Sequence, residues 1–317
     1  MSLVEVQGLS ISFGSLRQPI HAVRHLDLSI ERGTIHGLIG ESGCGKTISG
    51  MALLGLLPQS AHVAAEAFSF DGLNLLDVAK SLRGRRIAMI SQDPAAALNP
   101  VLRIGRQMDD VLRSHTGLPR FQRRAQAEEL LAATGLPDPR RVLNSYPHQL
   151  SGGMQQRVVI AQALATGADF IIADEPTTAL DVTVGAQVLA LLQRLVRERA
   201  LTVLMITHDM DVIAECCDSA TVLYAGYTVE TGPTDDLLAK PRHPYSQALL
   251  AALPDAVAKG GKLASIEGHF PPPFTAIGGC AFAPRCSKAL AICHEAKPPR
   301  HGCIDHSWTC HLEPHHG

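Results

Sequence analysis

Residues 40–47, GESGCGKT, have the spacing of a loop that binds the phosphates of a nucleotide. Backbone N–H groups at a helix start can surround a pyrophosphate only where side chains leave room, hence the glycines. The Lys46 ammonium adds charge for the β- and γ-phosphates, and the Thr47 hydroxyl can ligate Mg²⁺. A glycine-rich turn without function is the alternative that the rest of the chain has to exclude. The predicted phosphate site comprises Gly40, Glu41, Ser42, Gly43, Cys44, Gly45, Lys46 and Thr47.

Two acidic residues, Asp174 and Glu175, follow the apolar run at residues 170–173. At the carboxyl end of a buried strand beside a phosphate loop, Asp174 can hold Mg²⁺ directly or through water. Glu175 would then orient the attacking water as a general base. Without other motifs, it would be equally reasonable to interpret Asp174 and Glu175 as two acidic residues that begin a loop and have no catalytic role. The phosphate loop in the same chain favours catalysis.

A second helix start suited to an anion is predicted at residues 150–157, LSGGMQQR. Ser151 is a suitable N-cap, and the N–H groups that follow at Gly152 and Gly153 would be exposed. One phosphate loop does not need two such helix starts. Two copies placed face to face would use both, because each copy would complete the other's site.

Alternating strands and helices have to position these groups. Residues 34–39 read as a buried strand before the phosphate loop, and residues 47–57 as an apolar helix after it. Other strands or hairpins are predicted at residues 3–31, 66–72, 86–91, 169–173, 201–206 and 220–230. A helical stretch is predicted from residue 99 to about 165, with a clear amphipathic pattern at 121–133. Another amphipathic helix is predicted at residues 182–199. This order predicts a parallel α/β core with a helical insert.

The composition limits the functional classes. With 317 residues, 46% of them hydrophobic, the chain can form one large α/β domain and a smaller appendage. A net charge of −2 and an aromatic content of 4% give no support for nucleic-acid binding. The first residues lack a signal-peptide pattern, and no apolar run reaches membrane-spanning length. We therefore expect a cytosolic protein whose contact with a membrane comes through partners.

Five of the eight cysteines lie in about the last forty residues, beyond a Pro- and Gly-rich linker that starts at residue 254. In a reducing cytosol this clustering favours metal ligation over disulfides. Zinc sites usually use close C-x2-C pairs, so the spacing C-x5-C-x6-C-x9-C-x6-C suits a [4Fe–4S] cluster better. Zinc, disulfides and free thiols remain open, and most of the histidines from His294 onward are expected to be solvated.

The motifs GESGCGKT, LSGGMQQR and IIADEP, followed by His208, resemble in order and spacing those of the ATP-binding-cassette family of transport ATPases. The resemblance covers roughly residues 3–253, for which it implies a nucleotide-binding domain within residues 1–253. The implied fold is that of a P-loop NTPase, with a parallel sheet core, an antiparallel β subdomain and a helical signature subdomain at about residues 95–165.

The same resemblance implies roles for single residues. Phe13 is similar to the aromatic residue that stacks on adenine, and Gln92 to the glutamine that contacts Mg²⁺ or the attacking water. Asp181 resembles the residue that couples the two sites of a dimer, and His208 the switch histidine at the γ-phosphate. One departure is Cys44, where serine is commoner; a thiol at a helix start is expected to be acidified and oxidisable.

Three further stretches are similar to the oligopeptide and dipeptide import branch, some of whose relatives carry nickel: YPHQ at 146–149, RHPYSQALL at 242–250 and GCAFAPRC at 279–286. Residues 254–317 would then be a linker and a Cys-rich C-terminal segment. Relatives with this tail have four cysteines that ligate the cluster, and the resemblance matches these positions to Cys280, Cys286, Cys293 and Cys310. Cys303 matches none of them.

This branch implies an ATPase subunit that energises a bacterial peptide importer with ATP and Mg²⁺. The implied partners are two transmembrane permeases, a second and often different ATPase subunit, and a substrate-binding protein. The subunit would lie at the cytoplasmic face of the plasma membrane. The alternatives are a soluble ATPase of the same family acting in translation or DNA repair, a nickel or metallophore importer, and a metal-sensing ATPase.

Overall fold

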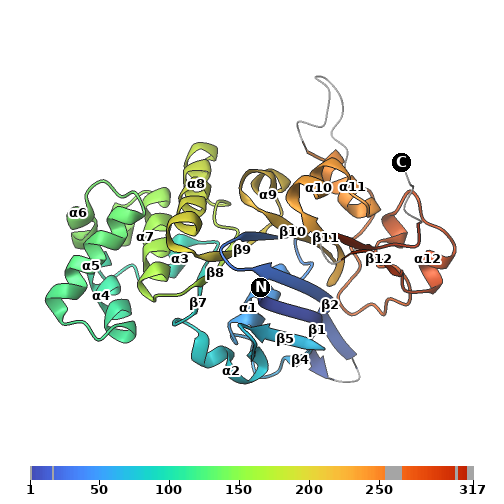
Figure 1. Ribbon diagram of the computed structural model, residues 1–317, viewed down its shortest axis with the longest axis horizontal. Helices are drawn as coiled ribbons and strands as arrows, with labels where there is room; N and C mark the ends of the chain where they lie inside the picture. Colours follow the sequence, from blue (N-terminus) through green and yellow to red (C-terminus); the bar gives the residue numbers. More distant parts are fainter. Residues whose placement is uncertain (1, 16–17, 254–265, 304–305, 313–317) are drawn as a thin grey trace. The chain divides into compact units, whose positions relative to one another are not determined.

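The computed structural model describes residues 2–15, 18–253, 266–303 and 306–312, which form two compact units (Figure 1). The first unit lies within Met1–Glu31, His36–Leu76 and Ile206–Gly317. The second comprises Arg32–Ile35 and Asp77–Met205. Most of the predicted linker, residues 254–265, lies outside the described residues.

The first unit is built on a sheet with the strand order β6-β5-β1-β2-β11-β10-β3, and β4 pairs with β1. β1 is antiparallel to β2 and β5, whereas β10 is parallel to β3. These strands are β1 (Ser2–Ser15), β2 (Gln18–Glu31), β3 (Ile35–Ile39), β4 (His62–Ala64), β5 (Ala67–Phe70), β6 (Leu73–Asn74), β10 (Ser219–Tyr224) and β11 (Tyr227–Pro233). The predicted strands around residues 34–39 and 66–72 and the hairpin at 220–230 are confirmed, with ends shifted by a few residues.

The helices of the first unit are short, and glycine, proline or capping residues mark their ends. The helix after the phosphate loop ends earlier than predicted, since Gly55 follows it with a φ of 61° and Pro58 comes soon after. Asp209 and the His243 ring accept backbone N–H groups at the starts of two others. These helices are α1 (Lys46–Leu53), α9 (Met210–Cys216), α10 (Thr234–Ala239) and α11 (Pro244–Ala251).

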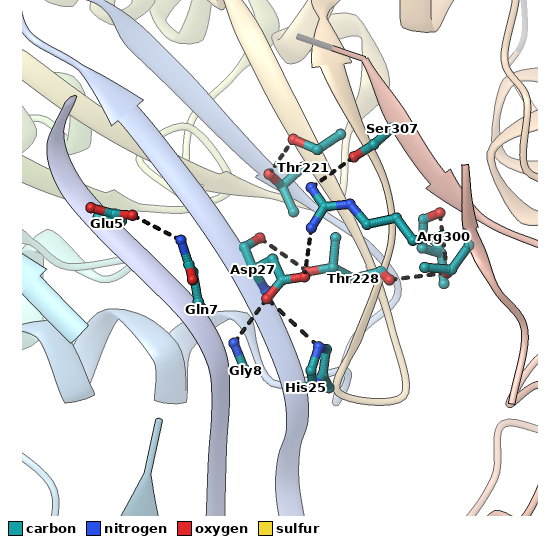
Figure 2. Close-up of polar contacts among 12 residues, drawn as sticks. Glu5, Gln7, Gly8, His25, Asp27, Thr221, Thr228, Arg300 and Ser307 are labelled. Carbon is teal, nitrogen blue, oxygen red and sulfur yellow. Dashed lines mark hydrogen bonds and ion pairs between the residues drawn. The ribbon is translucent and has the colours of Figure 1, made fainter. Parts of the chain in front are cut away.

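The described part of the C-terminal segment packs on the first unit. Strand β13 pairs antiparallel with β11, with Trp308 opposite Glu230. Arg300 donates to the Asp27 carboxylate in β2 at 3.3 Å, as Figure 2 shows. The Phe282 side chain joins a buried cluster of the unit. The segment's elements are η3 (Ala283–Arg285), α12 (Ile292–Glu295), β12 (Arg300–Gly302) and β13 (Ser307–Thr309).

The second unit combines strands in the order β9-β8-β7 with a group of helices. The strands are β7 (Ile87–Ile90), β8 (Phe170–Asp174) and β9 (Thr202–Thr207), and β7 is parallel to β8. The helices are α2 (Leu75–Leu82), α3 (Pro94–Ala97), α4 (Ile104–His115), α5 (Arg120–Ala133), α6 (Pro139–Asn144), η1 (Pro147–Gln149), α7 (Gly152–Ala165) and α8 (Val182–Arg199). Helices α4 to α7 pack on one another (Figure 1), and the predicted helix at 182–199 is confirmed.

None of the helices in the described part of the chain combines the length and the apolar character that crossing a bilayer requires.

Candidate functional site

The phosphate loop lies between β3 and α1, and close backbone contacts explain two of its three glycines. β3 is buried along its whole length and leads directly to Gly40. A Cβ atom on Gly40 would clash with the carbonyl oxygen of Leu223, and one on Gly45 would lie 2.5 Å from that of Ala22. Gly45 also has a φ of 109° as the N-cap of α1. Because side chains are excluded here, the loop can present its backbone to an anion.

The Lys46 side chain folds back onto the loop. It is only 6% exposed, and its Nζ donates hydrogen bonds to the carbonyl oxygens of Gly40 at 2.7 Å and Glu41 at 3.1 Å. A buried ammonium is costly unless polar atoms surround it, and these carbonyls meet that need. The Ser42 and Thr47 side chains are exposed. The loop therefore holds a positive charge beside the backbone that the sequence predicts to bind phosphate.

The Cys44 thiol behaves differently from the expectation. Its side chain is fully buried, and burial raises the pKa of the thiol, although the Lys46 charge acts in the opposite direction. Desolvation disfavours the thiolate, which is the reactive form. The expectation that the helix start would acidify Cys44 and make it oxidisable is therefore wrong.

Two other predicted residues belong to the first unit. His208 is exposed and follows β9, in a turn where the Asp209 amide donates to the Thr207 hydroxyl at 3.0 Å. Phe13 lies on β1 opposite Ile20 of β2 and is half-buried.

In the second unit, the two parallel strands β7 and β8 bring a glutamine to a glutamate. Ile90 pairs with Ala173, so the residues after the strand ends meet at one edge of the sheet. Gln92 Nε2 donates to Glu175 Oε2 at 3.1 Å, and the Thr178 hydroxyl donates to the same oxygen at 2.9 Å. Glu175 has a φ of 47°, a conformation that is uncommon for a residue with a side chain.

Asp174, one residue before this pair, closes β8 and is 5% exposed. A carboxylate in this position supplies the oxygen ligands that Mg²⁺ prefers. The strand end therefore carries a potential metal ligand and, next to it, a potential base.

The helix start predicted at LSGG is present at α7. The Ser151 hydroxyl accepts the Met154 N–H at 3.4 Å, and Ser151 and Gly152 are exposed. A Cβ on Gly153 would clash with Val184 in the first turn of α8, which explains the glycine. The Asp181 carboxylate accepts the Val184 N–H at 3.0 Å and so caps α8. The starts of α7 and α8 are thereby packed together.

The predicted residues thus form two groups, each within one compact unit. The phosphate loop, Phe13 and His208 belong to the first unit, and the second contains Gln92, Ser151, Gly152, Gly153, Asp174, Glu175 and Asp181. Thr178 was not predicted as a site residue, because a threonine after the two acids carries no local signal. Tyr245 and Arg285 were not predicted either; both contact the phosphate loop and lie in the stretches RHPYSQALL and GCAFAPRC.

The four cysteines predicted as cluster ligands gather in the C-terminal segment. Cys280 interacts electrostatically with Cys293 and Cys310, and Cys286 interacts with the same two. Cys293 Sγ accepts the Leu290 N–H and Cys310 Sγ accepts the Leu312 N–H, both at 3.4 Å. Cys303, in contrast, is exposed.

All eight cysteines are free thiols, which excludes a disulfide framework in this structure. Burial raises the pKa of Cys280, Cys286 and Cys310, so these thiols are protonated at neutral pH. Within the described ranges, no three His, Cys, Asp or Glu side chains are close enough together to hold a metal ion.

Of the four described histidines from His294 onward, His294 is exposed, as expected, whereas the other three make polar contacts. His301 Nε2 donates to the Cys310 carbonyl at 2.8 Å, and His311 Nε2 donates to the Ala296 carbonyl at 2.9 Å. His306 Nε2 contacts the fully buried Glu230 carboxylate at 2.9 Å. These three rings stabilise the segment. His315 and His316 lie outside the described residues.

Two protein-family models and several known proteins match this chain. The model of the ABC transporter family matches residues 23–178, and the model described as the C-terminal region of oligopeptide/dipeptide transporters matches residues 229–293. The chain is 39% identical over 315 residues to the dipeptide transport ATP-binding protein DppD of Haemophilus influenzae, covering 98% of this chain and 96% of the relative. It is 42% identical over 302 residues to DppD of Escherichia coli, covering 94% and 92%.

A third relative is the oligopeptide transport ATP-binding protein OppD of Salmonella typhimurium, 41% identical over 300 residues, 93% of this chain and 89% of the relative. Among solved structures, the dimeric cassette MJ0796 bound to ADP and Pi covers 73% of this chain and 98% of its own, with a TM-score of 0.61 and 28% identity. The cbiO1 protein of Clostridium perfringens, 23% identical with a TM-score of 0.61, shares the fold. The chain thus has the ABC cassette fold, with a P-loop and a mixed sheet.

Proposed function

The chain belongs to the ABC transporter family of ATP-binding proteins and is an ATP-hydrolysing transport ATPase, and we propose that its cargo is a dipeptide or an oligopeptide. The observation that carries this proposal is the match over nearly the whole chain to DppD and OppD relatives. The match includes the C-terminal stretch after the cassette, where the oligopeptide/dipeptide model applies.

ATP is bound by the phosphate loop, where the Lys46 ammonium neutralises the β- and γ-phosphates. The present contacts of Lys46 Nζ with two carbonyl oxygens support this role, because phosphate oxygens can replace them with charge-assisted bonds. Phe13 stacks on the adenine, and the exposed His208 bonds to the γ-phosphate. Thr47, Gln92 and Asp174 would hold Mg²⁺, which would supply further charge neutralisation at the phosphates.

Glu175 is the general base. Its carboxylate takes a proton from water, and the water oxygen attacks the γ-phosphorus in line with the bond to the leaving ADP oxygen. The bonds from Gln92 and Thr178 to Glu175 Oε2 support this role, because they orient the carboxylate before ATP binds. The products are ADP and inorganic phosphate.

A second cassette completes each site. Ser151, Gly152 and Gly153 of one cassette bind the ATP held by the other, and Asp181 couples the two sites. The exposed start of α7 supports this, as does Val182, an apolar residue that is 90% exposed directly after Asp181. The second cassette is a related but different chain, so that the assembly is a heterodimer.

Cys280, Cys286, Cys293 and Cys310 hold a [4Fe–4S] cluster. Their mutual interactions and the N–H groups donated to sulfur suit this group, because such hydrogen bonds are typical around cluster thiolates. The four ligands would have to lose their protons and close up on binding iron, since the protonated thiols are not a ligand set on their own. Zinc is the alternative metal.

Two transmembrane permeases dock on the Gln92 segment and the helical insert, and a substrate-binding protein delivers the peptide to them. A groove of about 610 Å³ supports the docking site. Its wall carries Phe121, which is 72% exposed, and is rich in arginine: Arg103, Arg106, Arg120, Arg123 and Arg124. A permease segment with apolar and acidic side chains would fit it. The chain is then peripheral, on the cytoplasmic face of the plasma membrane.

The domain division follows the same proposal. Residues 1–253 form the nucleotide-binding domain, with a helical subdomain at about 95–165, and residues 254–317 form the linker and the Cys-rich segment. The packing of α4 to α7 and the cysteines of the last part support it.

Uptake by cells tests the cargo. We expect that deleting the gene abolishes uptake of radiolabelled dialanine or trialanine, and that the wild-type chain restores it while Glu175→Gln does not. Loss of radioactive nickel uptake with normal peptide uptake would point to the nickel branch instead. Normal uptake of all three, with a defect in translation or DNA repair, would point to a soluble ATPase and contradict the proposal.

A further inference from the structure

Arg285, in the C-terminal segment, contacts the phosphate loop from a buried position. Its side chain is 6% exposed, and Nη1 donates to the Glu41 carboxylate at 2.8 Å and to the Tyr224 hydroxyl at 3.3 Å. Nη2 and Nε donate to the carbonyl oxygens of Ile266 at 3.0 Å and Glu267 at 3.1 Å. One guanidinium thus connects the phosphate loop with the start of the C-terminal segment.

Glu41 is fixed by three different contacts. Its carboxylate meets Arg285, its backbone N–H donates to the Tyr245 hydroxyl at 3.0 Å, and its carbonyl accepts from Lys46 Nζ at 3.1 Å. The residue that receives Arg285 therefore also determines where the phosphate-binding lysine lies. A displacement of Glu41 would change both the path of the loop and the position of the Lys46 ammonium.

Aromatic rings pack behind this contact. The Tyr224 ring lies 4.6 Å from Tyr245 and 5.2 Å from Phe282 between centroids, and Phe270 lies 5.3 Å from Tyr224. The Arg285 guanidinium lies 5.8 Å from the Tyr224 ring. Two of these rings, Phe270 and Phe282, belong to the C-terminal segment, so the segment forms part of the wall behind the loop.

Electrostatics favours a lasting contact. Burial alone disfavours the charge on Arg285, but the hydrogen bonds and charge interactions with Glu41 and Tyr224 together outweigh burial and raise the pKa of the guanidinium. Removing one partner of such a pair leaves a charge in a poorly solvated place, and the loop would move to solvate it.

We propose that Arg285 is a positioning residue for the phosphate loop, through which the Cys-rich C-terminal segment controls the affinity for ATP. This inference rests on one part of the proposed function, which is that the phosphate loop binds ATP. The segment reaches the nucleotide site through Glu41, without touching the nucleotide. A displacement of the segment at Arg285 is then transmitted to ATP binding through Glu41.

A double-mutant cycle on the full chain tests this. The variants are Arg285→Gln, Glu41→Gln and the pair together, and the measurement is the dissociation constant of a fluorescent ATP analogue. We expect each single change to weaken binding about tenfold, with the double variant no weaker than either single one, because both break the same contact. Arg285→Lys keeps the charge but loses the fork of donors, so we expect an intermediate value.

Arg300→Gln is the matched control. Arg300 belongs to the same segment and forms an ion pair at 3.3 Å with Asp27, which belongs to β2 and not to the phosphate loop; Figure 2 shows this pair. It should leave the dissociation constant unchanged. Thermal unfolding of every variant, without nucleotide, separates a loss of binding from a loss of fold.

The outcomes are distinct. Wild-type affinity in Arg285→Gln, additive effects in the double variant, or an equal loss in Arg300→Gln would each overturn the inference. Failure of the wild-type chain itself to bind the analogue would overturn the proposed nucleotide site instead. If Arg285→Gln does not fold, Glu41→Gln and Arg285→Lys decide the same question.

Discussion

Gln92 and Glu175, which are 83 positions apart in the chain, are joined by a hydrogen bond of 3.1 Å from the glutamine amide to the glutamate carboxylate. The bond forms because β7 and β8 are parallel neighbours that end at the same edge of the sheet. The residue predicted to contact Mg²⁺ or water thus also orients the residue predicted to be the base.

Replacing this carboxylate by its amide tests the base directly. We expect Glu175→Gln to lower kcat for ATP hydrolysis by about 100-fold or more, because an amide does not accept the proton of water at neutral pH. ATP affinity should be retained, since the new side chain has the same size and can still accept the Thr178 hydroxyl. Phosphate release and nucleotide binding are the measurements. Glu129→Gln, at an exposed site in the same unit, is the control, and turnover at the wild-type rate in Glu175→Gln would exclude this base.

Two glycines of the phosphate loop should differ in their tolerance of alanine. At Gly43, with a φ of 83°, an added Cβ meets no atom within 4 Å, so only backbone strain of about 1 kcal/mol is expected. At Gly45, with a φ of 109°, the Cβ also lies 2.5 Å from a carbonyl oxygen, and we expect a loss of about 3 kcal/mol. Urea unfolding without nucleotide measures both. Equal losses at the two positions would contradict the packing described for Gly45.

Acid should destabilise the first unit through a buried histidine. His36 is 2% exposed between the hydroxyls of Ser219 at 2.7 Å and Thr221 at 2.9 Å, and burial lowers its pKa from 6.5 to about 4. Between these two values the unfolded chain binds a proton that the folded chain does not, so stability falls as the pH falls through this window. From about pH 7 to about pH 5, the expected contribution is roughly 2 kcal/mol.

Urea unfolding at the two pH values measures this effect. His36→Gln can keep a hydrogen bond to a hydroxyl but does not titrate, so its loss of stability between the two pH values should be smaller. His62→Gln, on exposed β4, is the control and should behave as the wild type. A His36→Gln variant with the full wild-type pH dependence would exclude His36 as the source.

Metal content tests the C-terminal cysteines. Purified without oxygen, the chain should contain about four irons and four sulfides, with broad visible absorption. Cys293→Ser should lose them, because this thiol is 6% exposed and interacts with the other three predicted ligands. Cys303→Ser, at an exposed thiol, should keep them. Stoichiometric zinc, or no metal in anaerobic wild-type protein, would exclude the cluster and leave the ATPase assignment intact.

The sequence by itself determined those parts of the protein whose conformation depends on residues that are close together in the chain. The phosphate loop between a buried strand and a helix, the acids at the end of β8, and the capped start of α7 could all be predicted. Each is a run of a few residues in which backbone conformation, burial and capping are set locally. The family resemblance then gave the order of the motifs a common function.

Only the tertiary structure decided how distant residues act on these motifs. The burial that raises the pKa of Cys44 comes from the surrounding fold, and it outweighs the helix start next to the thiol. Arg285 meets Glu41 across 244 positions of sequence. Such contacts depend on strand pairing and packing, for which residue spacing along the chain carries no signal, so the influence of the C-terminal segment on the phosphate loop could be inferred only from the folded chain.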